Sequence, residues 1–198
     1  MANVNQPKGL WPTQYLNGAP WNGQARLYFI ASTDANAYAI GDPVASSGSA
    51  DTNGVPGVTL ATAGAGNAVR GVIVGCGTTE GLMADPNNLN TTVIPATKSQ
   101  NYYVMVADDP NILFEAQEVG TGTALTAAEV GLNANLLAGA NNGYQSGWQI
   151  DNSGEGTGAT LQVRLMGLVR RQQNAFGAYA KWLVKINNHE LAAGTAGV

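Results

Sequence analysis

The chain has 198 residues, of which 11% are charged, and its formal net charge is −4. This acidic balance argues against a general nucleic-acid binder, which needs a basic face to displace counterions from phosphates. One histidine and one cysteine supply few groups for acid–base or nucleophilic catalysis, and a single cysteine excludes an intramolecular disulfide.

Targeting and membrane signals are also missing from the sequence. No apolar run approaches the roughly 18 residues of a membrane span, and residues 1–7 lack the basic start and apolar core of a signal peptide. We therefore expect a protein that is made in a cytoplasm, contacts neither membrane nor nucleic acid, and holds no cofactor or metal.

Residues 1–23 are predicted to form an extended N-terminal arm. They contain three prolines and three large aromatic residues: Pro7, Pro12, Pro20, Trp11, Tyr15 and Trp21. Each proline disfavours helix at the preceding residue, and the segment is too short to bury its aromatic rings by itself. Two docking sites are open, the body of the same chain and a neighbouring subunit, because the extended arm can reach roughly 75 Å.

Residues 24–198 are predicted to form a single β-rich domain. Its apolar residues recur with a period of two or in short runs, which is typical of strands. Strands are expected at 24–30, near 44, at 58–60, 70–74, 102–107, 112–119, 147–150, 161–166 and 181–186. In the last of these, Trp182, Val184 and Ile186 are predicted to face inward and Lys181 and Lys185 outward.

Turn signals separate these strands. Residues 46–57 are rich in Gly, Ser and Asp and are predicted to be a surface loop. The sequence Asp-Asp-Pro-Asn at 108–111 predicts a hairpin that joins strands 102–107 and 112–119. Helix is expected only as a turn or two at 126–130, where Thr126 can cap the first turn and Glu129 follows three residues later.

Many short strands joined by Gly-rich loops predict an all-β fold. No strand–helix–strand alternation indicates a parallel sheet. We therefore expect an antiparallel β-sandwich or barrel of the jelly-roll type, with long loops and the N-terminal arm.

Four acidic residues lie in or near the predicted 108–111 turn: Asp108, Asp109, Glu115 and Glu118. Their oxygens suit a hard cation, but the regular spacing of calcium loops is missing, so we interpret them as turn and strand residues. Two carboxylates are also all that a glycosidase requires. A hydrolase that uses acidic loop residues is therefore one alternative.

His189 is the only histidine, so no second histidine can act with it, and it lies close to the C-terminus. We predict a surface or edge residue at the end of the last strand rather than a catalytic base. Cys76 follows an apolar run and is predicted to be a small buried side chain rather than a reactive thiol. No catalytic residue is assigned.

Arg170 and Arg171 form the sharpest basic feature. They belong to a basic C-terminal region, since five of the nine cationic residues lie in the last 35 residues. Forked guanidinium groups can clamp the carboxylates of a partner, and a solvated loop is the equally open alternative.

Eight short sequences follow one another along nearly the whole chain: NQPKGLWP (5–12), YLNGAPWNG (15–23), IGDPV (40–44), VMVADDP (104–110), FEAQE (114–118), VGLNA (130–134), LMGLVRR (165–171) and AKWLVKINNH (180–189). In this order they resemble a family of tailed-bacteriophage structural proteins, interpreted as head decoration or capsid cement proteins. The resemblance implies a small β-rich protein on the outside of an icosahedral shell. Its partner would be the major capsid protein, with self-association as a dimer or trimer.

These observations lead to one expected function and, besides the hydrolase, one further alternative. We expect a non-enzymatic virion protein that staples neighbouring capsid subunits against internal DNA pressure through many weak contacts. Trp11, Tyr15 and Trp21 are the expected arm anchors, because aromatic residues dominate interface energetics, and Arg170 and Arg171 are the expected polar clamps. The alternative is a carbohydrate-binding or adhesin module of a tail fibre or other surface appendage.

Overall fold

The computed structural model describes residues 3–77, 92–194 and 197. Strands make up 40% of the structure, and they pair mainly into antiparallel sheets. The predicted helical segment is a 3₁₀ turn, Ala127–Glu129, with Thr126 as its N-cap and Glu129 completing the capping box. The predicted all-β class is confirmed.

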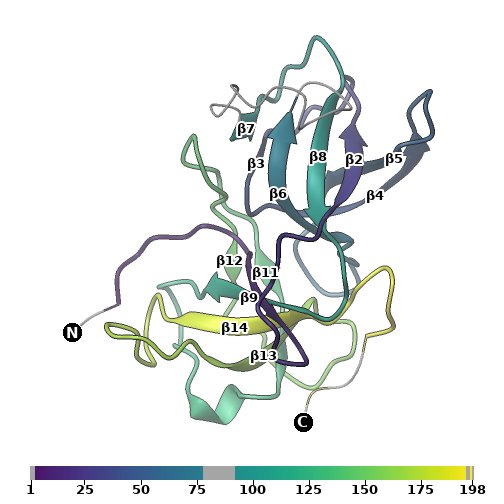
Figure 1. The fold of residues 1–198 in the computed structure, drawn as a ribbon. Helices are drawn as coiled ribbons and strands as arrows, with labels where there is room; N and C mark the ends of the chain where they lie inside the picture. The colour runs from purple at the N-terminus through teal and green to yellow at the C-terminus, as the bar shows by residue number, and fades with distance from the viewer. Residues whose placement is uncertain (1–2, 78–91, 195–196, 198) are drawn as a thin grey trace.

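The strands are, in chain order, β1 (Trp11–Tyr15), β2 (Arg26–Ile30), β3 (Tyr38–Ala39), β4 (Pro43–Ala50), β5 (Pro56–Leu60), β6 (Gly71–Gly77), β7 (Val93–Ile94), β8 (Tyr102–Ala107), β9 (Ile112–Gln117), β10 (Asn133–Ala134), β11 (Leu136–Leu137), β12 (Gln149–Ile150), β13 (Val163–Leu168) and β14 (Lys181–Ile186). They form two lobes that lie one above the other in Figure 1.

The upper lobe is a closed barrel with the strand order β2-β5-β4-β6-β8 (Figure 1). Its neighbours are antiparallel except β2 and β5, which run parallel. Inward side chains such as Ile30, Val44, Ile73 and Val104 fill the barrel and are fully buried. The barrel is closed, so none of its five strands is left as a free edge.

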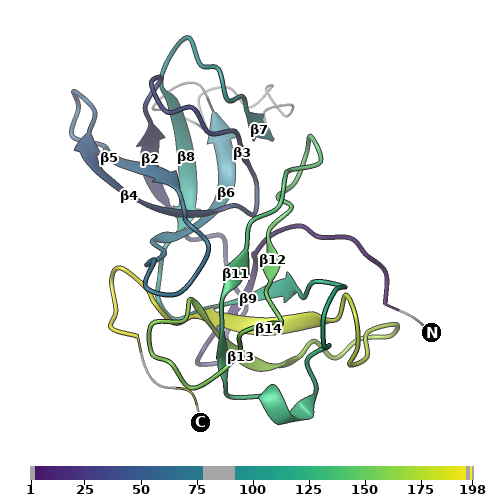
Figure 2. The same cartoon turned by 180° about the vertical axis from the view of Figure 1, so that it is seen from behind.

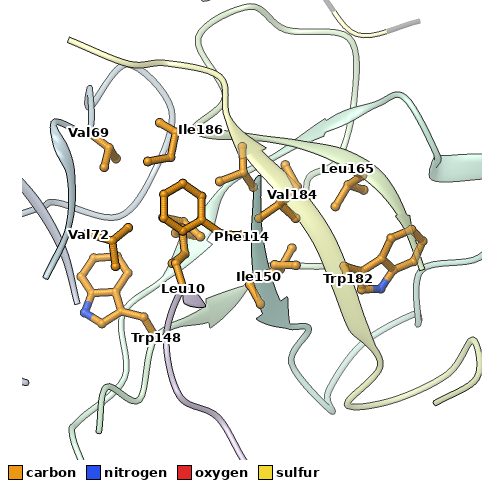
Figure 3. Packing of buried hydrophobic residues seen from close by; sticks show 14 of the residues in the cluster. Leu10, Val69, Val72, Phe114, Trp148, Ile150, Leu165, Trp182, Val184 and Ile186 are labelled. Carbon is orange, nitrogen blue, oxygen red and sulfur yellow. The ribbon is translucent and has the colours of Figure 1, made fainter. Parts of the chain in front are cut away.

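The lower lobe is a five-stranded antiparallel sheet with the order β1-β9-β14-β13-β10. The two-stranded pair β11-β12 crosses one face of it, as Figure 2 shows from behind. Phe114 of β9 is paired with Val184 of β14, and both belong to one buried cluster with Trp148 and Ile150 of the β11-β12 side (Figure 3). This face is therefore the inner, core-forming face of the lower sheet.

The last strand follows the predicted alternation. In β14, Trp182, Val184 and Ile186 are buried, whereas Lys181 and Lys185 are only partly covered. A strand with one face on a core shows this period of two because successive side chains point to opposite faces.

The predicted hairpin between 102–107 and 112–119 is wrong. β8 pairs with β2 and β6 in the barrel, while β9 pairs with β1 and β14 in the lower sheet. Residues 108–111 therefore connect the two lobes. The buried Asp108 carboxylate fixes this connection, because it accepts a 2.6 Å hydrogen bond from the Tyr28 hydroxyl and lies 3.6 Å from Arg70 Nε of the barrel.

The N-terminal arm docks on the same chain. β1 pairs with β9, so that Trp11 is opposite Glu115 and Tyr15 is opposite Ile112. Leu10, which immediately precedes β1, is fully buried in the lower core (Figure 3). The predicted boundary at residue 23 falls between β1 and β2, and the chain on its two sides contributes to one sheet.

The backbone of the arm beside Leu10 packs closely against the backbone at Gly41, and this contact stabilises the docked arm. The Leu10 amide donates a 3.0 Å hydrogen bond to the Gly41 carbonyl. Gly9 and Gly41 both have positive φ, and a Cβ on Gly9 would collide with the Gly41 carbonyl oxygen. Glycine is required here because only it combines this backbone conformation with such close packing.

Two further expectations are corrected. The predicted loop 46–57 is largely a hairpin of β4 and β5, with a short turn in which Asp51 accepts hydrogen bonds from the Asn53 and Val55 amides. His189 is buried rather than at the surface, because residues 187–190 return to the barrel and His189 bridges Val69. The first error arises because β4 and β5 contain Gly, Ser and Pro, which have low strand propensity. The second arises from the long-range pairing of His189 with Val69.

Candidate functional site

The outer face of the lower sheet, opposite its core, carries the candidate site. Along β9 and β14 the residues between the core positions point outward, so that Glu115 is paired with Leu183. Trp11 of β1 is opposite Glu115 on the other side, and Gly167 of β13 is opposite Leu183. These four residues form one row across four strands.

A groove of about 660 Å³ lies on this outer face. Leu183 and Gly167 contribute to its lining together with three exposed hydrophobic side chains: Val130, Met166 and Phe176, whose exposed fractions are 42%, 37% and 45%. Contiguous exposed apolar surface of this kind marks an interaction site more often than scattered exposed residues do.

A β-bulge shapes the groove. Met166 follows the alternation of β13 and is exposed, and the register between β13 and β14 then shifts between Leu165 and Gly167. After the shift, Gly167 is opposite the outward Leu183 and Leu168 packs toward the core. Gly167 has a φ of 149°, and a Cβ there would meet no other atom within 4 Å. The bulge thus brings Gly167 to the outer face next to Met166 and leaves open space there.

The loop between β13 and β14 forms another part of the groove. Phe176 comes from this loop, and its ring lies 5.6 Å from that of Trp182. Arg170, at the start of the loop, is exposed and lines the groove. It forms no ion pair within the described part of the chain, so its charge is available to a ligand.

Arg171 behaves differently from its neighbour. Its guanidinium binds the Glu115 carboxylate through two hydrogen bonds of 2.9 and 3.0 Å, and Lys8 Nζ lies 3.2 Å from the same carboxylate. Lys8 Nζ also lies 5.2 Å from the centre of the Trp11 ring. The Arg171 guanidinium, which we expected to bind a carboxylate of a partner, therefore binds a carboxylate of its own chain.

The structure brings some of the predicted interface residues together and separates others. Trp11, Arg170 and Arg171 share the outer face with Glu115. Tyr15 and Trp21 instead pack against the core, and the Trp21 Nε1–H donates to the Gln24 carbonyl at 3.2 Å. Trp21 also lines a cavity of about 70 Å³ with Trp11, where the arm meets the barrel.

Sequence reasoning missed the apolar part of the groove: Val130, Met166, Phe176 and Leu183. For Met166 a signal existed, since the alternation of 161–166 places an apolar residue on the outward face. For Phe176 and Val130 no local signal exists, because loop folding brings them to the groove.

The acidic residues considered for chemistry have separate structural roles. Asp108 is at the lobe connection, and Asp109 caps its own turn by accepting from the Asn111 amide at 2.8 Å. Glu118 is fully buried, where desolvation raises its pKa to about 7, and the Trp182 Nε1–H donates to it at 2.9 Å. Residues 3–77, 92–194 and 197 contain no group of three or more His, Cys, Asp or Glu that could hold a metal ion.

The histidine and the cysteine are both held in uncharged forms. Burial lowers the pKa of His189 to about 4, and its Nδ1 accepts a 3.0 Å hydrogen bond from the Leu191 amide. Burial raises the pKa of the Cys76 thiol to about 12. At neutral pH the imidazole is therefore neutral and the thiol protonated, which suits packing better than nucleophilic chemistry.

Three comparisons with known proteins identified no relative of this chain. A scan against protein-family models found no match, and searches of curated proteins and of solved structures found none. In the part of the chain that the structure describes, no helix is both long and apolar enough to cross a bilayer.

Proposed function

We propose that this chain is a non-enzymatic virion structural protein that binds the outer surface of a phage capsid and staples neighbouring major capsid subunits. The observation that carries the proposal is the apolar groove with the unpaired Arg170 in its lining. Four of the sequences on which the phage resemblance depends also build this groove. LMGLVRR contributes Met166 and Arg170, AKWLVKINNH contributes Leu183, FEAQE contributes Glu115, and VGLNA contributes Val130.

The chemistry of the groove defines the capsid segment that would fit it. An apolar side chain of the partner would cover Val130, Met166 and Phe176. Its binding free energy would gain about 25 cal/mol for each Å² of apolar surface removed from water. Arg170 favours a carboxylate beside that side chain. The expected contact is therefore a capsid loop that presents an apolar residue next to Asp or Glu.

Stapling requires more than one such contact. A single groove of this size supports weak binding, and one chain with one groove joins no two capsid subunits. Self-association as a dimer or trimer places several grooves on one particle and raises the total affinity without any new type of contact. Self-association is therefore part of the proposed function.

Groove substitutions test this proposal on empty capsids assembled from the major capsid protein encoded with this chain. Met166→Lys and Arg170→Glu are expected to weaken co-sedimentation with capsids at least about tenfold, which corresponds to roughly 1.4 kcal/mol. Tyr144→Ala, in a loop outside the groove, is the matched surface control and should bind normally. Normal decoration by both groove variants would overturn the assignment of the groove.

Removal of residues 1–23 is unsuitable for this test. It deletes β1 from the lower sheet and Leu10 from the core, so lost binding would also follow from misfolding. Point substitutions on the outer face avoid this ambiguity.

A second candidate, carbohydrate binding by a tail or surface appendage, is favoured by one observation. Tyr144 has an exposed fraction of 72%, and the rings of such exposed aromatic residues can stack on sugars. Glycan-array binding that Tyr144→Ala abolishes, together with no binding to capsids, would favour this candidate.

A further inference from the structure

We infer that Lys181 and Gln117 form an intramolecular isopeptide bond that covalently joins β14 to β9. The two residues are directly paired across the antiparallel strands. Lys181 Nζ is hydrogen-bonded to Gln117 Oε1, so the amine already lies beside the carboxamide. Holding a nucleophile against its target in this way removes much of the entropic barrier to reaction.

The Gln117 carboxamide is held at both of its polar atoms. Its Oε1 accepts a 2.8 Å hydrogen bond from the Gln6 amide, and its Nε2 donates a 2.9 Å hydrogen bond to Asn5 Oδ1. The Gln6 N–H is placed to stabilise negative charge that develops on Oε1 during attack. The whole residue is buried, so water competes poorly with the amine.

The surroundings of Lys181 favour its nucleophilic form. Burial lowers the pKa of Lys181 to about 8, and Arg171 and Lys8 act in the same direction, whereas Glu115 opposes them. About one tenth of the amines are then neutral at pH 7, compared with less than about one in a thousand for an ordinary lysine. Nζ is also fixed by hydrogen bonds of 3.3 Å to the Val4 and Gln6 carbonyls.

The bond changes balance without any additional reactant. Nζ attacks Cδ of Gln117, the new Nζ–Cδ bond forms, and the Cδ–Nε2 bond breaks. The proton that neutral Nζ loses on forming the amide passes to Nε2, which leaves as ammonia and takes up a second proton from water. In total, a lysine ammonium and a carboxamide become a secondary amide and an ammonium ion.

An exit for the ammonium ion adjoins the reacting groups. A cavity of about 180 Å³ is lined by Lys181, Gln6 and Asn3, with an open side toward solvent. The bond would tie β14, the central strand of the lower sheet, to its neighbour β9 beside the N-terminal segment. This inference is independent of the proposed capsid function.

Peptide mapping of the folded wild-type protein tests whether the bond between Lys181 and Gln117 forms. The purified chain is incubated, denatured and digested with a protease that cleaves after acidic residues. The expected result is one linked species containing Gln117 and Lys181, lighter than the two separate peptides by one ammonia, about 17 Da. Fragmentation must place the link at these two side chains, which separates it from ammonia loss at Asn-Gly sequences.

Two variants serve as controls. Lys181→Arg keeps the positive charge but cannot form the amide, and should yield two separate peptides. Lys185→Arg alters the other partly covered lysine of β14 and should yield the linked species as the wild type does. Unmodified Gln117 and Lys181 in separate wild-type peptides after prolonged incubation would overturn the inference.

Discussion

Arg171 and Glu115 form a two-pronged ion pair on the outer face of the lower sheet, with N–O distances of 2.9 and 3.0 Å. Arg170, the adjacent residue, lines the groove instead. Two neighbouring arginines of identical chemistry thus have different surroundings. One holds the loop between β13 and β14 to the sheet, and the other is free to bind.

This difference predicts different effects on stability. Arg171→Ala is expected to lower the free energy of unfolding by about 1–2 kcal/mol, because Glu115 is buried and loses its bidentate partner. Part of the effect is screened by solvent, since Arg171 is itself half-exposed. Arg170→Ala should change the free energy of unfolding by less than about 0.5 kcal/mol. Urea denaturation of both variants measures the contrast, and equal losses would show that the ion pair does not stabilise the loop.

Leu10 tests whether the arm belongs to the core of its own chain. Leu10→Ala is expected to destabilise the fold by about 2–5 kcal/mol, because it leaves a cavity among fully buried side chains. Leu16→Ala, in the same arm but exposed, is the matched control and should have little effect. Thermal unfolding of the isolated protein is the measurement. An unchanged Leu10→Ala melting temperature would mean that the arm is not docked in solution.

Glu118 predicts a particular dependence of stability on pH. Its pKa rises from the ordinary 4.5 to about 7 on folding, because burial disfavours the carboxylate. A raised carboxyl pKa means that the folded state binds the proton more tightly than the unfolded state. Glu118 therefore favours folding below pH 4.5, and this contribution is lost as the pH rises to about 7, by about 3 kcal/mol at most.

Glu118→Gln removes this titration and retains an oxygen for the Trp182 Nε1–H. The variant should gain stability relative to wild type as the pH rises from 4.5 to 7. Urea denaturation across this range, with the difference between the two proteins plotted against pH, isolates Glu118 from other titrating groups such as Asp42. A difference that stays constant would contradict the prediction.

The strand predictions succeeded where the pattern is local. β14 was predictable because Trp182, Val184 and Ile186 alternate with two lysines, and any strand with one buried face shows this period. The capped turn at Ala127–Glu129 was predictable for a similar reason, since its hydrogen bonds join residues three apart. In β13 the predicted alternation of buried and exposed residues is observed only from Val163 onward. Gln162 is fully buried because its side chain binds the Thr62 and Asn67 carbonyls far along the chain.

The all-β class, the strand positions near the C-terminus and the outward side of Met166 were determined by the sequence alone, because propensity and period are properties of neighbouring residues. The groove, the separate surroundings of Arg170 and Arg171 and the juxtaposition of Lys181 with Gln117 were decided only by tertiary structure. Each depends on which strands pair and where a bulge shifts their register. Strand partners are chosen by packing between segments distant in sequence, and adjacent residues carry no record of that choice.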